Sequence, residues 1–192
     1  MQSATTPEDN ILNPRKVEII DDIVYMSPLP NFKHNKIMFR ITSPFEAYLK
    51  GKKCSVHMVG NVYIDKDNPK TLVIPDISIL CEPDKFKLAG YYGVPSLIVE
   101  ILSTNRKDDL GTKFEFYERM GVSEYWIVDP LNDSINQYIL VNGRYKLLDA
   151  YRHLLQEEFE TLDEKEQEEY KTSIVPNIFS DLDIPLKDVF ED

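Results

Sequence analysis

The sequence contains few of the residues that build disulfide frameworks or zinc sites. It has two cysteines and three histidines in 192 residues. The histidines are scattered, so no spacing predicts a zinc site. Cys54 and Cys81 lie far apart in separate apolar segments. We expect them to be reduced, buried thiols of a cytoplasmic protein, with a lone disulfide as the alternative.

Long apolar runs are also missing. The longest, Ser96–Leu102 and Tyr125–Val128, are far shorter than the roughly 20 residues of a membrane span. Residues 1–10 are polar and acidic and contain no apolar signal core, so we do not expect secretion. No phosphate-cradling glycine loop is present. These absences argue against a membrane protein, a secreted protein and a nucleotide-binding motif.

The chain lacks the excess of positive charge that is common in nucleic-acid-binding proteins. Its net charge is −11. The charge is uneven, because the part from Tyr151 onward has 13 acidic and four basic residues, a net of −9, which leaves −2 for residues 1–150. The main body is therefore almost neutral, which weakens the electrostatic objection to a nucleic-acid substrate without removing it.

The length fits a single globular domain. We expect residues 1–14 to form a flexible arm, 15–192 to form one domain, and 156–171 to form a charged, exposed segment. The order of elements is a helix, several strands, a second helix and further strands. That order predicts an α/β (mixed α+β) fold with a central mixed sheet flanked by helices.

The expected elements follow from hydrophobic periodicity and turn residues. Pro44 should kink the first helix or divide it in two, because proline removes a backbone donor. The residues after Ile174 should pack back onto the body. The expected elements are a hairpin at a sheet edge over Lys16–Met26, a helix over Asn31–Lys50, strands over Cys54–Val59, Asn61–Ile64 and Leu72–Cys81, a loop or short helix over Lys85–Gly93, a buried strand over Ser96–Leu102, a helix over Arg106–Met120, and strands over Glu124–Asp129, Ser134–Leu140 and Arg144–Leu148.

Three charged residues interrupt apolar patterns. Glu100 lies inside Leu97–Leu102, which otherwise resembles a central strand buried on both faces. A buried carboxylate needs a cation, a metal or a proton, so Glu100 predicts either a functional site or a structural salt bridge. Asp76 follows Pro75 at the start of a strand, where a turn or cap residue is also common.

Lys113 begins an otherwise apolar helix face that continues with Phe116, Tyr117 and Met120. Its side chain either extends to water or returns over the end of the preceding strand toward Glu100. If the three groups converge, the two carboxylates can hold Mg²⁺ and the lysine can orient water or stabilise developing charge.

Several spaced blocks of this sequence resemble a known family. They are Val73–Ser78, Leu97–Ser103 and Lys113–Asp129, with an N-terminal block of Val17–Asp22, Met26–Pro28 and His34 and a weaker similarity near Ser173–Phe190. In this order they closely resemble the Uma-type restriction endonuclease family of the PD-(D/E)XK nuclease superfamily. The resemblance runs from about Lys16 to Leu148.

The resemblance implies that Asp76 and Glu100 are metal ligands, with the carbonyl of Ile101 as a further ligand. The superfamily lysine belongs two residues after the glutamate, where this chain has Leu102. The resemblance therefore implies that Lys113 supplies the amine from the helix.

Three further residues are candidates for supporting roles. His34 matches a family position and could contact substrate or an acid of the site, although an ordinary surface histidine is as good an interpretation. Glu46 could be an additional ligand, but its position suits a solvated glutamate better. Tyr117 lies one turn from Lys113 and is expected to orient it.

We therefore expect a metal-dependent endonuclease that hydrolyses phosphodiester bonds in DNA with Mg²⁺, or Mn²⁺ in its place. Two alternatives remain: a nuclease-fold binding or regulatory protein without catalysis, and an interaction protein that uses the acidic 156–171 segment. A homodimer is plausible, because cutting both strands commonly uses two copies. Basic residues that could meet phosphates are Lys33, Lys36, Arg40, Lys50, Lys52, Lys53, Arg106 and Lys107.

Overall fold

A computed structural model describes residues 15–103 and 111–191 of the chain. The arm expected at residues 1–14 lies outside this range, as do Arg106, Lys107 and the first part of the second expected helix. Within the described ranges, no helix is both long enough and apolar enough to cross a membrane.

A six-stranded mixed sheet forms the centre of the fold, as predicted. Its strand order is β10-β9-β8-β7-β4-β3, and all neighbouring pairs are antiparallel except β7 and β8, which are parallel. Because parallel neighbours need a crossover, α4 (Thr112–Met120) connects these two strands. The strands are β3 (Ser55–Met58), β4 (Ile77–Leu80), β7 (Leu97–Ile101), β8 (Glu124–Asp129), β9 (Ser134–Val141) and β10 (Arg144–Arg152).

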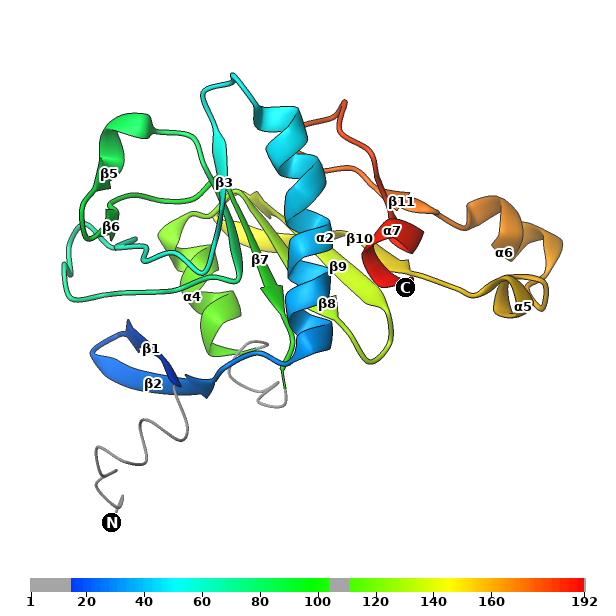
Figure 1. Ribbon diagram of the computed structural model, residues 1–192, viewed down its shortest axis with the longest axis horizontal. Coiled ribbons are helices and arrows are strands. Elements are labelled where there is room, and N and C mark those ends of the chain that lie inside the picture. The colour runs from blue at the N-terminus through cyan, green and yellow to red at the C-terminus, as the bar shows by residue number, and fades with distance from the viewer. Residues whose placement is uncertain (1–14, 104–110, 192) are drawn as a thin grey trace, which may run out of the picture.

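Helices cover both faces of the sheet, with α2 (Phe32–Leu49) in front of it in Figure 1 and α4 behind it. Every residue of β7 and β8 is buried, as expected for central strands. Because side chains alternate along a strand, β7 supplies two separate cores. One contains Val99 with Ile41 and Phe45 of α2, and the other contains Ile98 with Phe116 of α4.

The first helix runs through Pro44 as one helix, so the predicted division into two is wrong. Ile41 and Phe45, on either side of the proline, are both fully buried against the sheet. This burial outweighs the single backbone hydrogen bond that proline removes. The hydroxyls of Thr42 and Ser43, just before the proline, donate to the carbonyls of Met38 and Phe39 one turn earlier.

The predicted N-terminal hairpin is present as β1 (Arg15–Ile20) and β2 (Ile23–Pro28). It forms a two-stranded sheet of its own instead of extending an edge of the central sheet. Two backbone hydrogen bonds between Ile19 and Leu72, of 2.8 and 3.0 Å, attach it to the body. The hairpin lies near the start of α2 in Figure 1.

The segment between β3 and β7 has less regular structure than predicted. In the expected strand Asn61–Ile64, only Val62 forms bridges, to Val73 and Tyr91. In the expected strand Leu72–Cys81, continuous pairing begins after Pro75, because proline has no N–H to donate. The expected loop or short helix over Lys85–Gly93 instead contains a 3₁₀ turn, Pro83–Lys85, and a small hairpin of β5 (Phe86–Lys87) and β6 (Gly90–Tyr91).

The C-terminal residues pack onto the body, as predicted. Ile174, Leu186 and Val189 are fully buried in the α2-side core. The buried carboxylate of Glu124 accepts backbone hydrogen bonds from Asn177 and Ile178, each of 3.0 Å, and so ties this tail to β8. The tail elements are β11 (Ser173–Ile174), β12 (Ile184–Pro185) and α7 (Leu186–Phe190), preceded in the charged segment by α5 (Gln156–Phe159) and α6 (Glu164–Glu169).

Cys54 and Cys81 form a disulfide, so the prediction of two reduced thiols is wrong. The register of β3 and β4 pairs Ser55 with Leu80, which places the two cysteines opposite each other one position further along. Residues far apart in sequence therefore become cross-strand neighbours, a relation that their spacing does not show.

The disulfide predicts a redox-dependent stability. The two cysteines are 27 residues apart, and a Cys54→Ser/Cys81→Ser variant should lose about 2–4 kcal/mol in the free energy of unfolding, because its unfolded chain is less constrained. Urea denaturation with and without dithiothreitol measures this. The reductant should destabilise the wild-type protein and leave the variant unchanged; a wild-type protein that is indifferent to the reductant would contradict the assignment.

Candidate active site

Asp76 immediately precedes β4 and lies at the end of the neighbouring strand β7, next to Glu100, so the two acids come together as predicted. The register of β4 and β7 pairs Ile77 with Val99, and one position further along it places Asp76 opposite Glu100, on the same face of the sheet. Asp76 is 6% exposed and Glu100 is 1% exposed. The backbone N–H of Ile101 donates to Asp76 Oδ2 at 2.9 Å, which fixes the aspartate against the end of β7.

Lys113 reaches Glu100 from the first turn of α4, also as predicted. Its Nζ lies 3.0 Å from Glu100 Oε1, and the lysine is buried. Tyr117, one turn later, donates its hydroxyl hydrogen to the same oxygen at 2.9 Å. The helix that follows β7 therefore carries both side chains back to the end of that strand. There Lys113 and Tyr117 both bind the carboxylate of Glu100.

The hairpin contributes two charged residues that the sequence reasoning missed, Lys16 and Glu18. Glu18 is 1% exposed; its Oε1 accepts from the N–H of Ile74 at 2.8 Å, and its Oε2 lies 3.1 Å from Lys113 Nζ. Lys16 Nζ donates to the Ile74 carbonyl at 2.8 Å and lies 3.4 Å from Asp76 Oδ1. Glu18 lies between Val17 and Ile19 in a strand, and this acid within an apolar run was the available signal.

His34 contacts an acid of the site, which is one of its two predicted interpretations. It is buried in the first turn of α2, where Asn31 caps the helix by accepting from the His34 N–H. Its Nε2 lies 3.1 Å from Asp76 Oδ2. A surface histidine is therefore excluded.

Glu46 lies outside this cluster, so its suggested role as an additional ligand is wrong. It is exposed on α2, 12 residues after His34, which is about 18 Å along a helix axis. It lines a separate groove with Phe39 and Ser43.

Burial and neighbouring charges shift the pKa values of the two opposed acids in opposite directions. Burial raises the pKa of Glu100 to about 7, although the charges of Lys113 and Lys16 counteract it in part. Burial also acts to raise the pKa of Asp76, but the hydrogen bond with His34 and the charge of Lys16 outweigh it and hold that pKa well below its usual range. Asp76 is therefore an anion at neutral pH, whereas the charge of Glu100 depends on the nearby cations Lys113 and Lys16.

Tyr117 stays protonated at neutral pH. Burial and the nearby Glu100 carboxylate raise the pKa of its hydroxyl well above its usual value. It is therefore a fixed hydrogen-bond donor to Glu100.

The family comparison identifies the relatives of this chain. Residues 9–171 match the model of the Uma2 family, described as "Putative restriction endonuclease". The chain belongs to the Uma2 family. The sequence blocks that resemble this family contain Asp76, Glu100 and Lys113, and these are residues that the fold of this Uma2 protein brings together.

Two similar proteins were found. An uncharacterised protein of Synechocystis sp. is 27% identical over 139 residues, which covers 71% of this chain and 65%, less than two thirds, of that protein. The crystal structure of a "putative nuclease belonging to DUF820" from Anabaena variabilis superposes with a TM-score of 0.65 at 17% identity, covering 97% of this chain and 98% of that one. At this identity the superposition shows that the two proteins share a fold.

The carboxylates of Asp76 and Glu100 are the type of ligand that a hard divalent cation prefers. Over residues 15–103 and 111–191, no group of three or more histidine, cysteine, aspartate or glutamate side chains is arranged as a metal site. Mg²⁺, however, commonly binds through one or two carboxylates and completes its shell with water and substrate phosphate oxygens. Asp76 and Glu100, opposite each other at one strand end, supply such a pair.

The raised pKa of Glu100 predicts a stability that falls with rising pH. Between its ordinary pKa of 4.5 and about 7, the folded state holds a proton that the unfolded state has released. The free energy of unfolding should therefore decrease relative to a Glu100→Gln variant as the pH rises from about 5 to about 7, by at most about 3 kcal/mol. Asp76 titrates below this window, because its pKa is held low.

Chemical denaturation in EDTA at several pH values measures this difference. EDTA removes any contribution from bound divalent cations. Stability curves of the wild-type and Glu100→Gln proteins that stay parallel through the window would show that Glu100 titrates normally.

Proposed function

We propose that this Uma2 protein is a metal-dependent endonuclease that hydrolyses phosphodiester bonds in DNA. The observation that carries the proposal is the buried pair of Asp76 and Glu100 with the Lys113 amine 3.0 Å from Glu100. Family membership and the shared nuclease-like fold support it.

Asp76, Glu100 and the Ile101 carbonyl would hold Mg²⁺, or Mn²⁺ in its place. When bound, such a cation lowers the pKa of water and neutralises charge on a phosphodiester. His34 and the Ile101 N–H both contact Asp76 Oδ2 and so fix the carboxylate orientation before a cation arrives. This preorganisation would avoid the cost of ordering the ligand during binding.

Lys113 would place positive charge next to the reacting phosphate. The two carboxylates of Glu18 and Glu100 hold its ammonium at 3.1 and 3.0 Å. A lysine ammonium held in this position would stabilise negative charge that develops on the phosphate or orient the attacking water. The helix thus supplies the amine that the superfamily pattern expects at the position of Leu102, which here is an apolar core residue.

The proposal predicts metal-dependent cleavage of DNA that requires Asp76. Purified protein with Mg²⁺ or Mn²⁺ should nick or linearise plasmid DNA, and EDTA should stop the reaction. Asp76→Asn should lower the rate by at least about 100-fold, because it removes a charged ligand. Equal nicking by the wild-type protein and Asp76→Asn would identify a contaminant and remove support for the assignment.

Lys113→Met should lower cleavage by about 100- to 1,000-fold while metal still binds, because its charge acts on the reacting phosphate. Removing this cation also leaves Lys16 as the remaining nearby cation for Glu18 and Glu100, and can destabilise the fold by about 3–5 kcal/mol. The rate is therefore measured at a temperature where circular dichroism shows the variant to be folded. Wild-type activity in a folded Lys113→Met protein would exclude the lysine from catalysis.

One observation favours a second candidate, a nuclease-fold binding protein without catalysis. The opposed acids already have partners within the chain, Lys16 and His34 for Asp76 and Lys113 for Glu100. Calorimetric titration with Mn²⁺ separates the candidates. The nuclease should bind Mn²⁺ through a site that Asp76→Asn removes, whereas a binding protein satisfied by its own cations should show no such site.

We also propose that the protein acts as a homodimer. Cleavage of both strands of a duplex commonly uses two active sites, and sedimentation of the purified protein on DNA would show whether two copies act together.

A further inference from the structure

A groove along the first turns of α2 combines positive charge with an exposed aromatic ring. Lys33, Lys36 and Arg40 occupy positions i, i+3 and i+7 and so share one face of the helix. Phe32, at the first helical position, is 94% exposed. The groove has a volume of about 470 Å³ and is lined by Phe32, Lys33, Lys36, Ile37, Arg40 and Phe190. We refer to it as the α2 groove.

Neighbouring groups hold two of these cations along the groove while leaving them accessible. Lys33 Nζ donates to the Pro130 carbonyl at 2.5 Å and to Asp133 Oδ1 at 3.1 Å, yet its side chain is 54% exposed. Arg40 donates to the Val189 carbonyl at 3.4 Å. In a chain with a net charge of −11, three cations on one helix face form a local positive surface.

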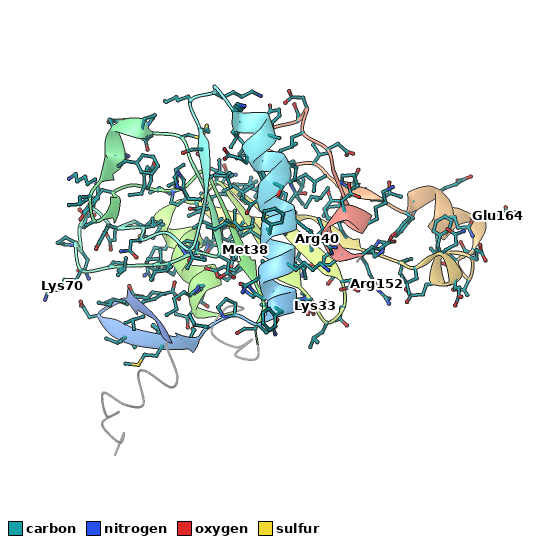
Figure 2. The ribbon with its side chains drawn as sticks, viewed as in Figure 1. Lys33, Met38, Arg40, Lys70, Arg152 and Glu164 are labelled. Atoms are coloured by element: carbon teal, nitrogen blue, oxygen red, sulfur yellow. A yellow bond between two sulfur atoms is a disulfide. The ribbon has the colours of Figure 1, made fainter. Side chains whose placement is uncertain are left out.

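The α2 groove and the candidate active site share the first turn of α2, although none of the buried site residues lines the groove. Lys33 lines the groove, and the next residue, His34, is buried and lies 3.1 Å from Asp76. Figure 2 shows Lys33 and Arg40 on the same side of α2, with Met38 on the other side. A strand whose phosphate lies at the Asp76 end could therefore continue along this face of the helix.

Three of the other basic residues suggested by the sequence, all within the described part of the chain, are not part of this groove. Lys50, Lys52 and Lys53 follow the opposite end of α2, ten or more residues beyond Arg40. Lys52 instead lies over the ring of Tyr48, 3.1 Å from its centroid.

We propose that the α2 groove binds a single strand of DNA leading to or from the candidate active site. This inference rests on the proposed nuclease function and specifies its substrate. Proteins that hold single strands combine a positive groove with aromatic rings on which bases stack. A duplex keeps its bases stacked inside, so the exposed ring of Phe32 would have no base face to contact. From Phe32 to Arg40 the helix rises about 12 Å, which is enough to contact more than one nucleotide of an extended strand.

Salt dependence of binding tests the role of the cations. Fluorescence anisotropy in EDTA, where no metal-dependent cleavage occurs, compares a labelled 12-nucleotide oligo(dT) with a 12-base-pair duplex. The single strand should bind more tightly. Lys36→Met should reduce the slope of log affinity against log salt by about 0.7, the value for one lost phosphate contact on a single strand.

Lys70→Met is the matched control for charge. Lys70 is an exposed lysine at the far edge of the molecule from Lys33 and Arg40, as Figure 2 shows. It should leave the slope unchanged. Identical slopes for Lys36→Met and Lys70→Met would overturn the proposal, as would a duplex that binds as tightly as the single strand.

Phe32→Ala tests the stacking contact. It should weaken oligo(dT) binding by about 5- to 150-fold, the range for one lost base–aromatic stack. Phe39→Ala is the matched control, because Phe39 is also exposed, at 63%, but lines the separate groove with Glu46. Equal affinities of Phe32→Ala and Phe39→Ala would overturn the stacking role.

The two proposals fail separately. A protein that cleaves DNA with Mg²⁺ but binds oligo(dT) independently of Lys36 and Phe32 would overturn the groove proposal alone. A protein without cleavage whose single-strand binding depends on both residues would overturn the nuclease proposal and support the groove.

Discussion

Three buried carboxylates that must be compensated by cations organise this molecule. Glu18, Asp76 and Glu100 are each at most 6% exposed. An unpaired buried carboxylate is costly, whereas one held by a cation and hydrogen bonds is tolerated. Lys113 lies between Glu18 and Glu100, and Lys16 lies next to Asp76. The hairpin, the sheet and α4 are therefore linked through one charged cluster.

The position of this cluster follows from strand register and from the crossover. The antiparallel register of β4 and β7 places Asp76 opposite Glu100. The parallel pairing of β7 and β8 requires α4 between them, and the first turn of that helix carries Lys113 back to the strand end. The register accounts for the pairing of Asp76 with Glu100, and the crossover accounts for the contact of Lys113 with Glu100, whereas the second acid that Lys113 contacts, Glu18, comes from the hairpin. The crossover thus brings the side chains of Glu100 and Lys113, 13 residues apart in sequence, into direct contact at 3.0 Å.

The sequence predicted the parts of the site that break a local pattern. Glu100 inside an apolar strand and Lys113 on an apolar helix face were both visible as misplaced charges. Glu18 also interrupts an apolar run, but that signal was not used, and the partners of Glu18 and Lys16 are distant: Glu18 contacts residue 74, 56 positions away, and Lys16 contacts residue 76, 60 positions away. The separate hairpin sheet has the same cause, since no local pattern shows that Ile19 pairs with Leu72.

Tertiary contacts also account for the wrong predictions. Cys54 and Cys81 become neighbours only once β3 and β4 pair, and burial on both sides of Pro44 keeps α2 continuous. The central mixed sheet and its two flanking helices were predictable, because a continuous apolar run such as Leu97–Ile101 and the helical periodicity of α2 specify burial locally.

A crystal structure of the protein soaked in Mn²⁺ tests the central claim most directly. The account predicts an anomalous scattering peak in contact with the carboxylates of Asp76 and Glu100, with Lys113 still beside Glu100. A soaked crystal with manganese bound only elsewhere, and with Lys16, His34 and Lys113 still paired to these acids, would contradict the assignment of this cluster as a metal-dependent active site.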